Sequence, residues 1–415
     1  MPAVFLAGNG MITLLILIAL AVLGWSYAAG RGLSRLSTVF DRLLRLSITS
    51  VIVSAAAAMA FAVLARMLHG YASGLFGVRV HDLAHDMPAL AALLAAGWCM
   101  LFVFAARKAV LVRMRRAAVA GRVTAVRVET HDVSHLFVPG YSLFQTVCRV
   151  AAVLPGNMVC RSRTREFSLR IPGLPRPLDG LRIVHLSDFH FERRLTPEYY
   201  RRLVTEANSL RPDIVAMTGD FYQSASCIPD IAAILAGLRA THGVYFVCGN
   251  HDIWHRPAEL VKALHKNGFV HLGGAIVRIA IGDACVEMAG TERPWRHDNL
   301  RSTLGPKPAG AFRLALTHHP DNALWLKDHD ADLVLAGHTH GGQNALPLLG
   351  PLVVPSCRGL GHAAGFVPYG DTLLYVTYGA SPAAAVLMPF RLLCPAEVVC
   401  LELTCAAPSP EARQQ

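Results

Sequence analysis

The spacing of hydrophobic and polar residues changes character along the chain. Three uncharged, mostly apolar stretches occupy the first 106 residues, at 11–29, 46–65 and 87–106. Each is about 20 residues long, which is enough for a helix to cross a hydrocarbon core of about 30 Å. We therefore expect residues 1–106 to form a transmembrane region with three spans.

Beyond residue 165 the apolar runs become short and alternate with amphipathic helical segments. Strands that alternate with helices are typical of a layered α/β domain, which we place at residues 165–405. The last ten residues, 406–415, are polar and are expected to be a disordered tail. The predicted strands are 181–187, 213–218, 243–248, 312–317 and 332–336, and the predicted helices are 196–210, 228–239 and 257–267.

Composition and charge support the membrane interpretation. The chain is 53% hydrophobic and only 16% charged, with a net charge of +11. Residues 1–130 carry 13 basic and 4 acidic side chains, so most of the excess positive charge lies beside the apolar stretches rather than across the enzyme-like half. This distribution argues against a nucleic-acid partner and favours membrane loops.

The loop charges also predict an orientation. Arg31, Arg35, Arg42 and Arg45 follow the first span, and a basic linker, 107–164, follows the third. The positive-inside rule then predicts a multi-pass protein of the cell (inner) membrane whose catalytic domain is cytoplasmic. The apolar segment 141–160 is expected to be an interfacial helix, a fourth span or a linker packed on the membrane. Arg149 near its middle favours the interfacial helix, whereas a crossing would move the domain to the other side.

Polar side chains gather where the predicted strands end. Because ligands bind open α/β sheets at the carboxyl ends of their strands, we expect these side chains to meet. Carboxylate, amide and imidazole groups suit Mn, Fe or Zn. The residues are Asp188 and His190, then Asp220, then Asn250, His251 and Asp252, then His318, and finally His338 and His340.

The motifs D-x-H, G-D, G-N-H-D, H-x-P and G-H-x-H, in this order, resemble those of the calcineurin-like metallophosphoesterases, and their flanks resemble the membrane-associated bacterial branch. The likeness covers residues 165–405 and implies an αββα sandwich with two divalent metal ions. It implies one metal held by Asp188, His190, Asp220 and His340, and another held by Asp220, Asn250, His318 and His338.

The same resemblance implies catalytic roles. His251 matches the histidine that protonates the leaving group, and Asp252 is expected to orient its ring. Trp254 and Arg256 follow this motif and are candidate substrate contacts, while residues 294–297 are a candidate lid. His319 is expected only to follow the ligand His318.

The function that we expect is hydrolysis of a phosphate ester by a metal-bridged hydroxide. An alternative within the same class is a hydrolase of a UDP-sugar-lipid (lipid A precursor) or another lipid pyrophosphate. An alternative of another class is a membrane receptor or transport protein with a vestigial phosphoesterase domain. Transport is disfavoured because the three predicted spans contain no Asp, Glu, Lys, Arg or His, the residues that usually mark intramembrane pathways.

Overall fold

The larger of the two compact units in the computed structural model contains two β-sheets with helices on their outer faces. This unit comprises residues 114–347 and 354–415. The residues that the structure describes are 88–137, 155–192, 195–346, 350–351, 354–382 and 391–405.

Most of the predicted membrane region lies outside the described residues. This holds for the predicted spans 11–29 and 46–65, for most of 141–160 and for the tail 406–415. Residues 88–106 begin helix α4 (Pro88–Val119), although most of their side chains are likewise not described. In the described part of the chain, no helix is long and apolar enough to cross a membrane.

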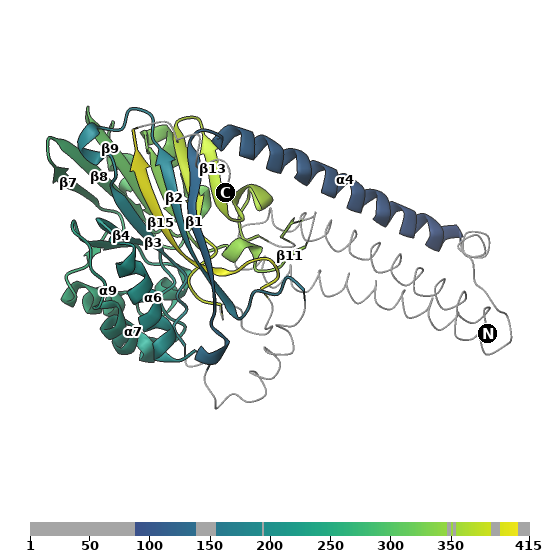
Figure 1. The fold of residues 1–415 in the computed structure, drawn as a ribbon, viewed down its shortest axis with the longest axis horizontal. Coiled ribbons are helices and arrows are strands. Elements are labelled where there is room, and N and C mark those ends of the chain that lie inside the picture. Colours follow the sequence, from purple (N-terminus) through teal and green to yellow (C-terminus); the bar gives the residue numbers. More distant parts are fainter. Residues whose placement is uncertain are drawn as a thin grey trace. The chain divides into compact units, whose positions relative to one another are not determined.

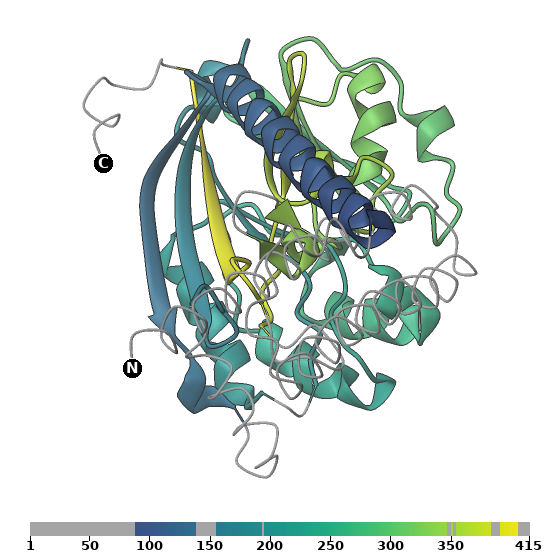
Figure 2. The ribbon, with the colours of Figure 1, turned by 90° about the vertical axis from the view of Figure 1, so that its right-hand side faces the viewer.

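The first sheet has seven strands in the order β1-β2-β15-β3-β4-β5-β6. Strands β3 to β6 run parallel, as expected for strands joined by helices, and β15 enters antiparallel to β3. Figure 2 shows β1 and β2 curving beside the yellow strand β15. The strands are β1 (Val123–Asp132), β2 (Arg161–Arg170), β15 (Ala396–Thr404), β3 (Arg182–Leu186), β4 (Ile214–Met217), β5 (Val244–Phe246) and β6 (Val270–His271).

Strand β1 belongs to the layered domain, which therefore begins before the predicted boundary at residue 165. Residues 123–132, which the charge pattern assigns to a basic linker, instead pair antiparallel with β2 at the edge of this sheet. Charged side chains on β1 and β2 pair with one another, as when Arg127 lies 3.5 Å from Glu166. The basic charge therefore belongs partly to an exposed edge strand, where charged side chains discourage pairing with another sheet.

The second sheet has six strands in the order β13-β14-β10-β9-β8-β7. Its central strands are parallel and its two edge strands are antiparallel to their neighbours. The strands are β13 (Gly365–Tyr369), β14 (Thr372–Val376), β10 (Leu333–Ala336), β9 (Ala311–Thr317), β8 (Ala284–Thr291) and β7 (Ile276–Ile281); β11 (Ala345–Leu346) and β12 (Gly350–Pro351) are shorter strands outside it.

Successive side chains of a strand point to opposite faces of its sheet, so each strand contributes to two hydrophobic cores. In β3, Ile183 faces the core between the two sheets, while its neighbour Val184 faces the core under the helices. Figure 1 shows α6, α7 and α9 together on the side of β3 and β4. A third core, which includes Trp325, covers the outer face of the second sheet. The helices of these layers are α6 (Pro197–Ser209), α7 (Ile228–Leu235), α8 (Asn250–Trp254), α9 (Pro257–Lys266), α10 (Leu300–Thr303) and α11 (Ala323–Leu326).

This arrangement is the predicted αββα sandwich, and the five predicted strands match β3, β4, β5, β9 and β10 to within two residues at each end. Three of these strands belong to the first sheet and two to the second, so both sheets deliver motif residues to one region.

Candidate metal centre

The candidate ligands lie just after the ends of strands β3, β4, β5, β9 and β10, and Asn250 among them begins helix α8. Of the nine non-glycine residues with positive φ in the described chain, five are candidate ligands. Such a backbone is uncommon away from glycine, and strain of this kind concentrates at functional sites. The five are Asp188, His190, Asp220, His338 and His340.

Two motif glycines allow neighbouring turns to approach each other. A Cβ atom on Gly219 would lie 2.3 Å from the backbone nitrogen of Gly249. A Cβ atom on Gly249 would in turn lie 2.1 Å from Oδ1 of Asp220. The G-D and G-N-H-D motifs therefore need glycine because their backbones pack directly against each other.

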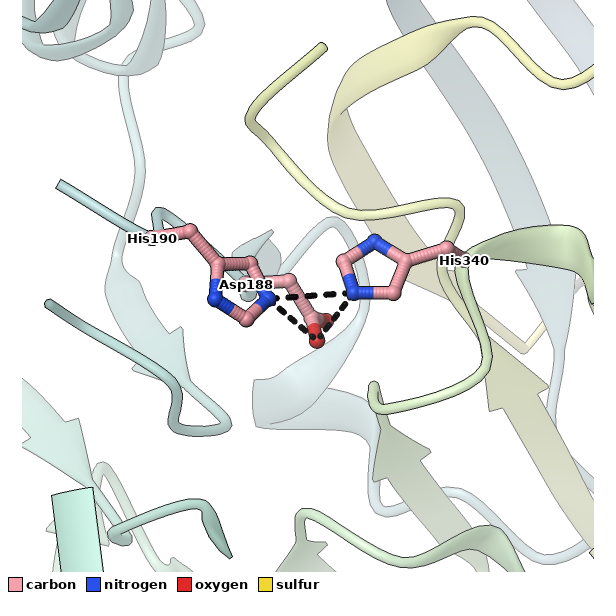
Figure 3. A group of neighbouring side chains, drawn as sticks. All are labelled: Asp188, His190 and His340. Carbon is pink, nitrogen blue, oxygen red and sulfur yellow. Dashed lines mark hydrogen bonds and ion pairs between the residues drawn. The ribbon is translucent and has the colours of Figure 1, made fainter. Parts of the chain in front are cut away.

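The first ligand cluster consists of Asp188, His190 and His340, whose side chains point toward one another (Figure 3). The Nε2 atoms of the two histidines are 3.1 Å apart. Oδ1 of Asp188 lies 3.8 Å from Nε2 of His190 and 3.4 Å from Nε2 of His340. The amide of Gln223 lies 2.7 Å from Nδ1 of His190. The amide atom placed at this distance is the nitrogen Nε2 of Gln223; a flip of the amide would turn its oxygen toward the ring to accept a hydrogen bond from Nδ1–H and would leave Nε2 of His190 free to bind a metal.

The second cluster consists of Asp220, His318 and His338. Nε2 of His318 lies 3.2 Å from Oδ2 of Asp220. Nδ1 of His318 donates to the carbonyl oxygen of Thr218 at 2.5 Å, which holds the ring in this orientation. The same Asp220 oxygen lies 3.6 Å from Nε2 of His190, so the Asp220 carboxylate faces both clusters.

The charges in the centre are strongly coupled. Burial lowers the pKa of His190 to about 3 and that of His340 well below its usual value, so both rings are neutral ligands at pH 7. Burial also raises the pKa of Asp188 to about 6. For His318, burial lowers the pKa, but the Asp220 and Asp188 carboxylates outweigh burial and raise the pKa of the ring to about 9. A divalent cation among these groups would supply the positive charge that a proton on His318 otherwise supplies.

An unpartnered buried atom also fits a metal. Asn250 is 1% exposed, and its Oδ1 atom has no hydrogen-bond partner among the described residues. A buried polar atom without a partner is costly, and a cation is one way to satisfy the carbonyl oxygen of Asn250. The donor set of carboxylate, amide and imidazole groups therefore suits divalent metal ions.

His251 lies at the edge of the first cluster. Its ring is 4.8 Å from that of His190, and its backbone N–H donates to Oδ1 of Asp220 at 2.9 Å. A ligand atom of His251 lies within 4.8 Å of those of His190 and Asp220, so the geometry also permits His251 to coordinate a metal. The ring of Trp254, which is 44% exposed, is 5.6 Å from that of His251. The guanidinium of Arg256 pairs instead with Glu259 on α9, at 2.8 Å.

Asp252 has partners other than those expected. Its carboxylate accepts the backbone N–H groups of Gly249, Asp220 and Phe221, each at 2.8 Å. Burial raises its pKa and the nearby charge of Asp220 adds to the rise, whereas the hydrogen bonds from the backbone N–H groups of Gly249 and Phe221 favour the ionised form and oppose it. Asp252 therefore connects two motif turns through their backbones, and its expected role in orienting the ring of His251 stays a prediction.

The aromatic ring of Trp295 lies beside the histidines of the second cluster. The Trp295 ring lies 4.8 Å from that of His338, 5.5 Å from that of His318 and 5.3 Å from that of His319. This places one residue of the expected lid, 294–297, against the second cluster. His319 accepts the backbone N–H of Asp321 through Nδ1, at 3.2 Å.

Glu292 is a supporting residue that sequence reasoning missed. Its Oε1 atom accepts the backbone N–H of Cys248 at 2.8 Å and lies 2.6 Å from Nε2 of His271. This fixes the backbone two residues before Asn250. Glu292 directly follows β8, which runs parallel to β9. Its position at the carboxyl end of a strand, like that of the candidate ligands, is the sequence feature that could have indicated it.

Known proteins are similar in sequence to the part of the chain that carries the candidate ligands. The family model described as calcineurin-like phosphoesterase matches residues 181–342, which include every candidate ligand. The uncharacterized metallophosphoesterase YkuE of Bacillus subtilis is 28% identical over 246 residues, covering 58% of this chain and 85% of that protein. The phosphodiesterase YaeI of Escherichia coli is 30% identical over 237 residues, covering 54% of this chain and 82% of that protein.

A vertebrate protein is similar over a smaller share of its length. The transmembrane protein with metallophosphoesterase domain of Danio rerio is 28% identical over 230 residues, which are 52% of this chain and 52% of that protein. The chain therefore spans about half the length of this relative.

Proposed function

This chain belongs to the calcineurin-like phosphoesterase family, whose members hydrolyse phosphoester bonds, and from that premise we propose that it cleaves phosphodiesters at a centre of two divalent metal ions. The observation that carries the proposal is the position of Asp220. Its carboxylate faces His318 at 3.2 Å and His190 at 3.6 Å, so one side chain can serve both ligand clusters.

The ligand assignment follows the two clusters. Asp188, His190 and His340 would hold one metal ion, and Asn250, His318 and His338 the other, with Asp220 shared between them. Mn, Fe and Zn all suit these donors. When bound, such a pair of cations neutralises the phosphate oxygens and lowers the pKa of water, which is the chemistry that hydrolysis of a phosphodiester requires.

The protein's own residues would then position the ester and move a proton. We assign His251 the protonation of the leaving oxygen, because its ring is only partly buried and stands beside the first cluster. Trp295 would form the wall that packs against the substrate and excludes water on the side of His338. Asp252 acts through the backbone, by holding the Asp220 and Asn250 turns at a fixed separation.

We assign the substrate to the diester class because YaeI, which is 30% identical to this chain, is named a phosphodiesterase. A test is a panel of bis(p-nitrophenyl) phosphate, p-nitrophenyl phosphate and a lipid pyrophosphate, assayed on the full chain in detergent with added Mn. We expect the diester to be cleaved fastest and the activity to disappear with a chelator. Preferential cleavage of the monoester or of the lipid pyrophosphate would contradict the diester assignment. Metal binding without turnover on any substrate would favour a vestigial domain.

We further propose that the first third of the chain attaches the enzyme to the cell membrane, with the catalytic domain on the cytoplasmic side. The long uncharged stretches and the basic excess beside them support this placement. A relative named as a transmembrane protein agrees with it. An anchored enzyme would meet amphiphilic phosphodiesters at the bilayer surface. Recovery of the full chain in the membrane fraction after a high-salt wash supports attachment, and recovery in the supernatant contradicts it.

A further inference from the structure

A basic pocket of about 660 Å³ lies between helix α9 and the loop after strand β8. Helix α9 contributes one face to it, because the lining residues recur at intervals of four along the helix. Pro257, Ala258 and Val261 form its apolar part. The remaining lining residues are all basic: Lys262, His265, Lys266, His271 and Arg296.

The two lysines of this pocket are available to a ligand. Lys262 and Lys266 are exposed, and neither side chain has a hydrogen bond or ion pair within the described chain. The acidic residue nearest to them in sequence, Glu259, pairs with Arg256 at 2.8 Å. These lysines therefore present two uncompensated positive charges on one helix face.

The opposite wall carries one more cation. Arg296 lies 3.3 Å from Oε2 of Glu292, whose carboxylate is 1% exposed and also accepts from His271. One buried carboxylate thus faces Arg296 and His271 together, and it does not reach the lysines across the pocket. The pocket as a whole is positive and suits an anionic group.

The pocket and the candidate metal centre are connected by one loop. Trp295, whose ring is 4.8 Å from that of His338, directly precedes Arg296 in the chain. Trp295 contacts the second cluster while the next residue, Arg296, lines the pocket, and consecutive Cα atoms are only about 3.8 Å apart. His271 lines the pocket and also supports, through Glu292, the backbone that leads to Asn250.

We infer that this pocket binds a second phosphate group of the substrate, beyond the phosphodiester that is cleaved. The inference deepens the proposed function and rests on it. A substrate with two phosphates separated by a short spacer would place the diester at the metal centre and the terminal phosphate between α9 and Arg296. Lysines and an arginine are suitable partners for a terminal phosphate because they combine charge with several N–H donors.

The test uses p-nitrophenyl phosphodiesters of α,ω-alkanediols with spacers of two to eight carbons, each ending either in a phosphate or in a hydroxyl. The scissile bond and leaving group are the same throughout. For at least one spacer we expect the terminal phosphate to raise kcat/KM about tenfold. Because the lysines are exposed, this gain should shrink as salt increases.

The variants separate the pocket from the metal centre. Lys262→Ala together with Lys266→Ala should remove most of the gain and leave the hydroxyl-terminated esters unchanged. Lys327→Ala, which alters a lysine paired with Asp328 at 2.6 Å, should keep the gain. A gain absent at every spacer length, or unchanged in the double variant, would overturn the inference while leaving the proposed function intact. Failure to cleave any of the esters would overturn the proposed function and the inference together.

Discussion

Oδ2 of Asp252 accepts the backbone N–H of Asp220 at 2.8 Å, so a residue of the G-N-H-D motif holds the candidate bridging ligand through its main chain. The same oxygen accepts from Gly249, and the other carboxylate oxygen accepts from Phe221. One buried side chain thereby connects the turns that follow β4 and β5.

Replacing Asp252 by Asn tests this connection. An amide keeps one acceptor oxygen and turns an NH₂ group toward a backbone donor, so at least one buried N–H loses its partner. We expect the free energy of unfolding to fall by about 1–3 kcal/mol and the metal content to fall with it. Urea unfolding and elemental analysis measure the two effects. The exposed Asp328→Asn is the matched control, and equal stability of both variants would show that Asp252 is not needed for this connection.

Asp220 and His251 should separate metal binding from proton transfer. Asp220→Asn removes the shared negative charge, so metal content and turnover should decrease together. His251→Ala should keep both metals and lower turnover by about 10²–10⁴-fold, with a smaller loss for esters that have good leaving groups. Elemental analysis and rates on aryl and alkyl esters measure this. Loss of a metal from His251→Ala would instead identify His251 as a ligand, which its position near His190 and Asp220 permits.

The stability of the domain should depend on pH through His185. This histidine is fully buried on β3, and burial lowers its pKa to about 3 from 6.5. Between these values the unfolded chain binds a proton that the folded chain does not. The contribution of the neutral His185 ring to the free energy of unfolding is therefore complete above pH 6.5 and is lost as the pH falls toward 3. From pH 7 to pH 5 the loss from this residue should be about 2 kcal/mol.

The comparison for this prediction is His185→Asn, which can still hydrogen-bond to the hydroxyl of Thr218, 2.8 Å from the His185 ring in the parent. We expect urea unfolding of the variant to change less between pH 7 and pH 5 than that of the parent. Identical pH dependence in the two proteins would mean that His185 does not carry this effect.

A buried ion pair stabilises the second sheet. Arg313 on β9 and Glu287 on β8 are each 1% exposed and lie 2.6 Å apart. Glu287→Ala would leave the guanidinium buried without its carboxylate, and we expect a loss of about 3–5 kcal/mol in the free energy of unfolding. Glu259→Ala breaks the exposed pair with Arg256 and should change the stability little. Similar decreases in the free energy of unfolding in the two variants would show that the buried pair matters no more to stability than the exposed pair.

The sequence was sufficient to predict the strands that carry the ligands. Continuous apolar runs such as that of β4 end abruptly in Gly219 and Asp220, and such runs are typical of buried parallel strands. The same logic places His318 after β9 and His338 after β10. Strand ends could therefore be read from local patterns, without knowledge of which strands share a sheet.

Other features depended on contacts that local patterns do not record. Strand β1 is mostly exposed at a sheet edge and rich in charges, so its pattern resembled that of a linker. The role of Asp252 depends on three backbone groups, and two of these lie about 30 residues away in sequence. Glu292 could not be linked to Cys248, 44 residues earlier, before β8 was known.

Sharing of Asp220 by two metal ions can be measured by electron paramagnetic resonance of the full chain loaded with Mn. Two ions joined by a carboxylate, about 4 Å apart, couple magnetically. We predict two Mn per chain and an exchange-coupled spectrum that Asp220→Asn abolishes. One Mn per chain, or two ions with independent six-line spectra, would show that Asp220 does not join two metal ions.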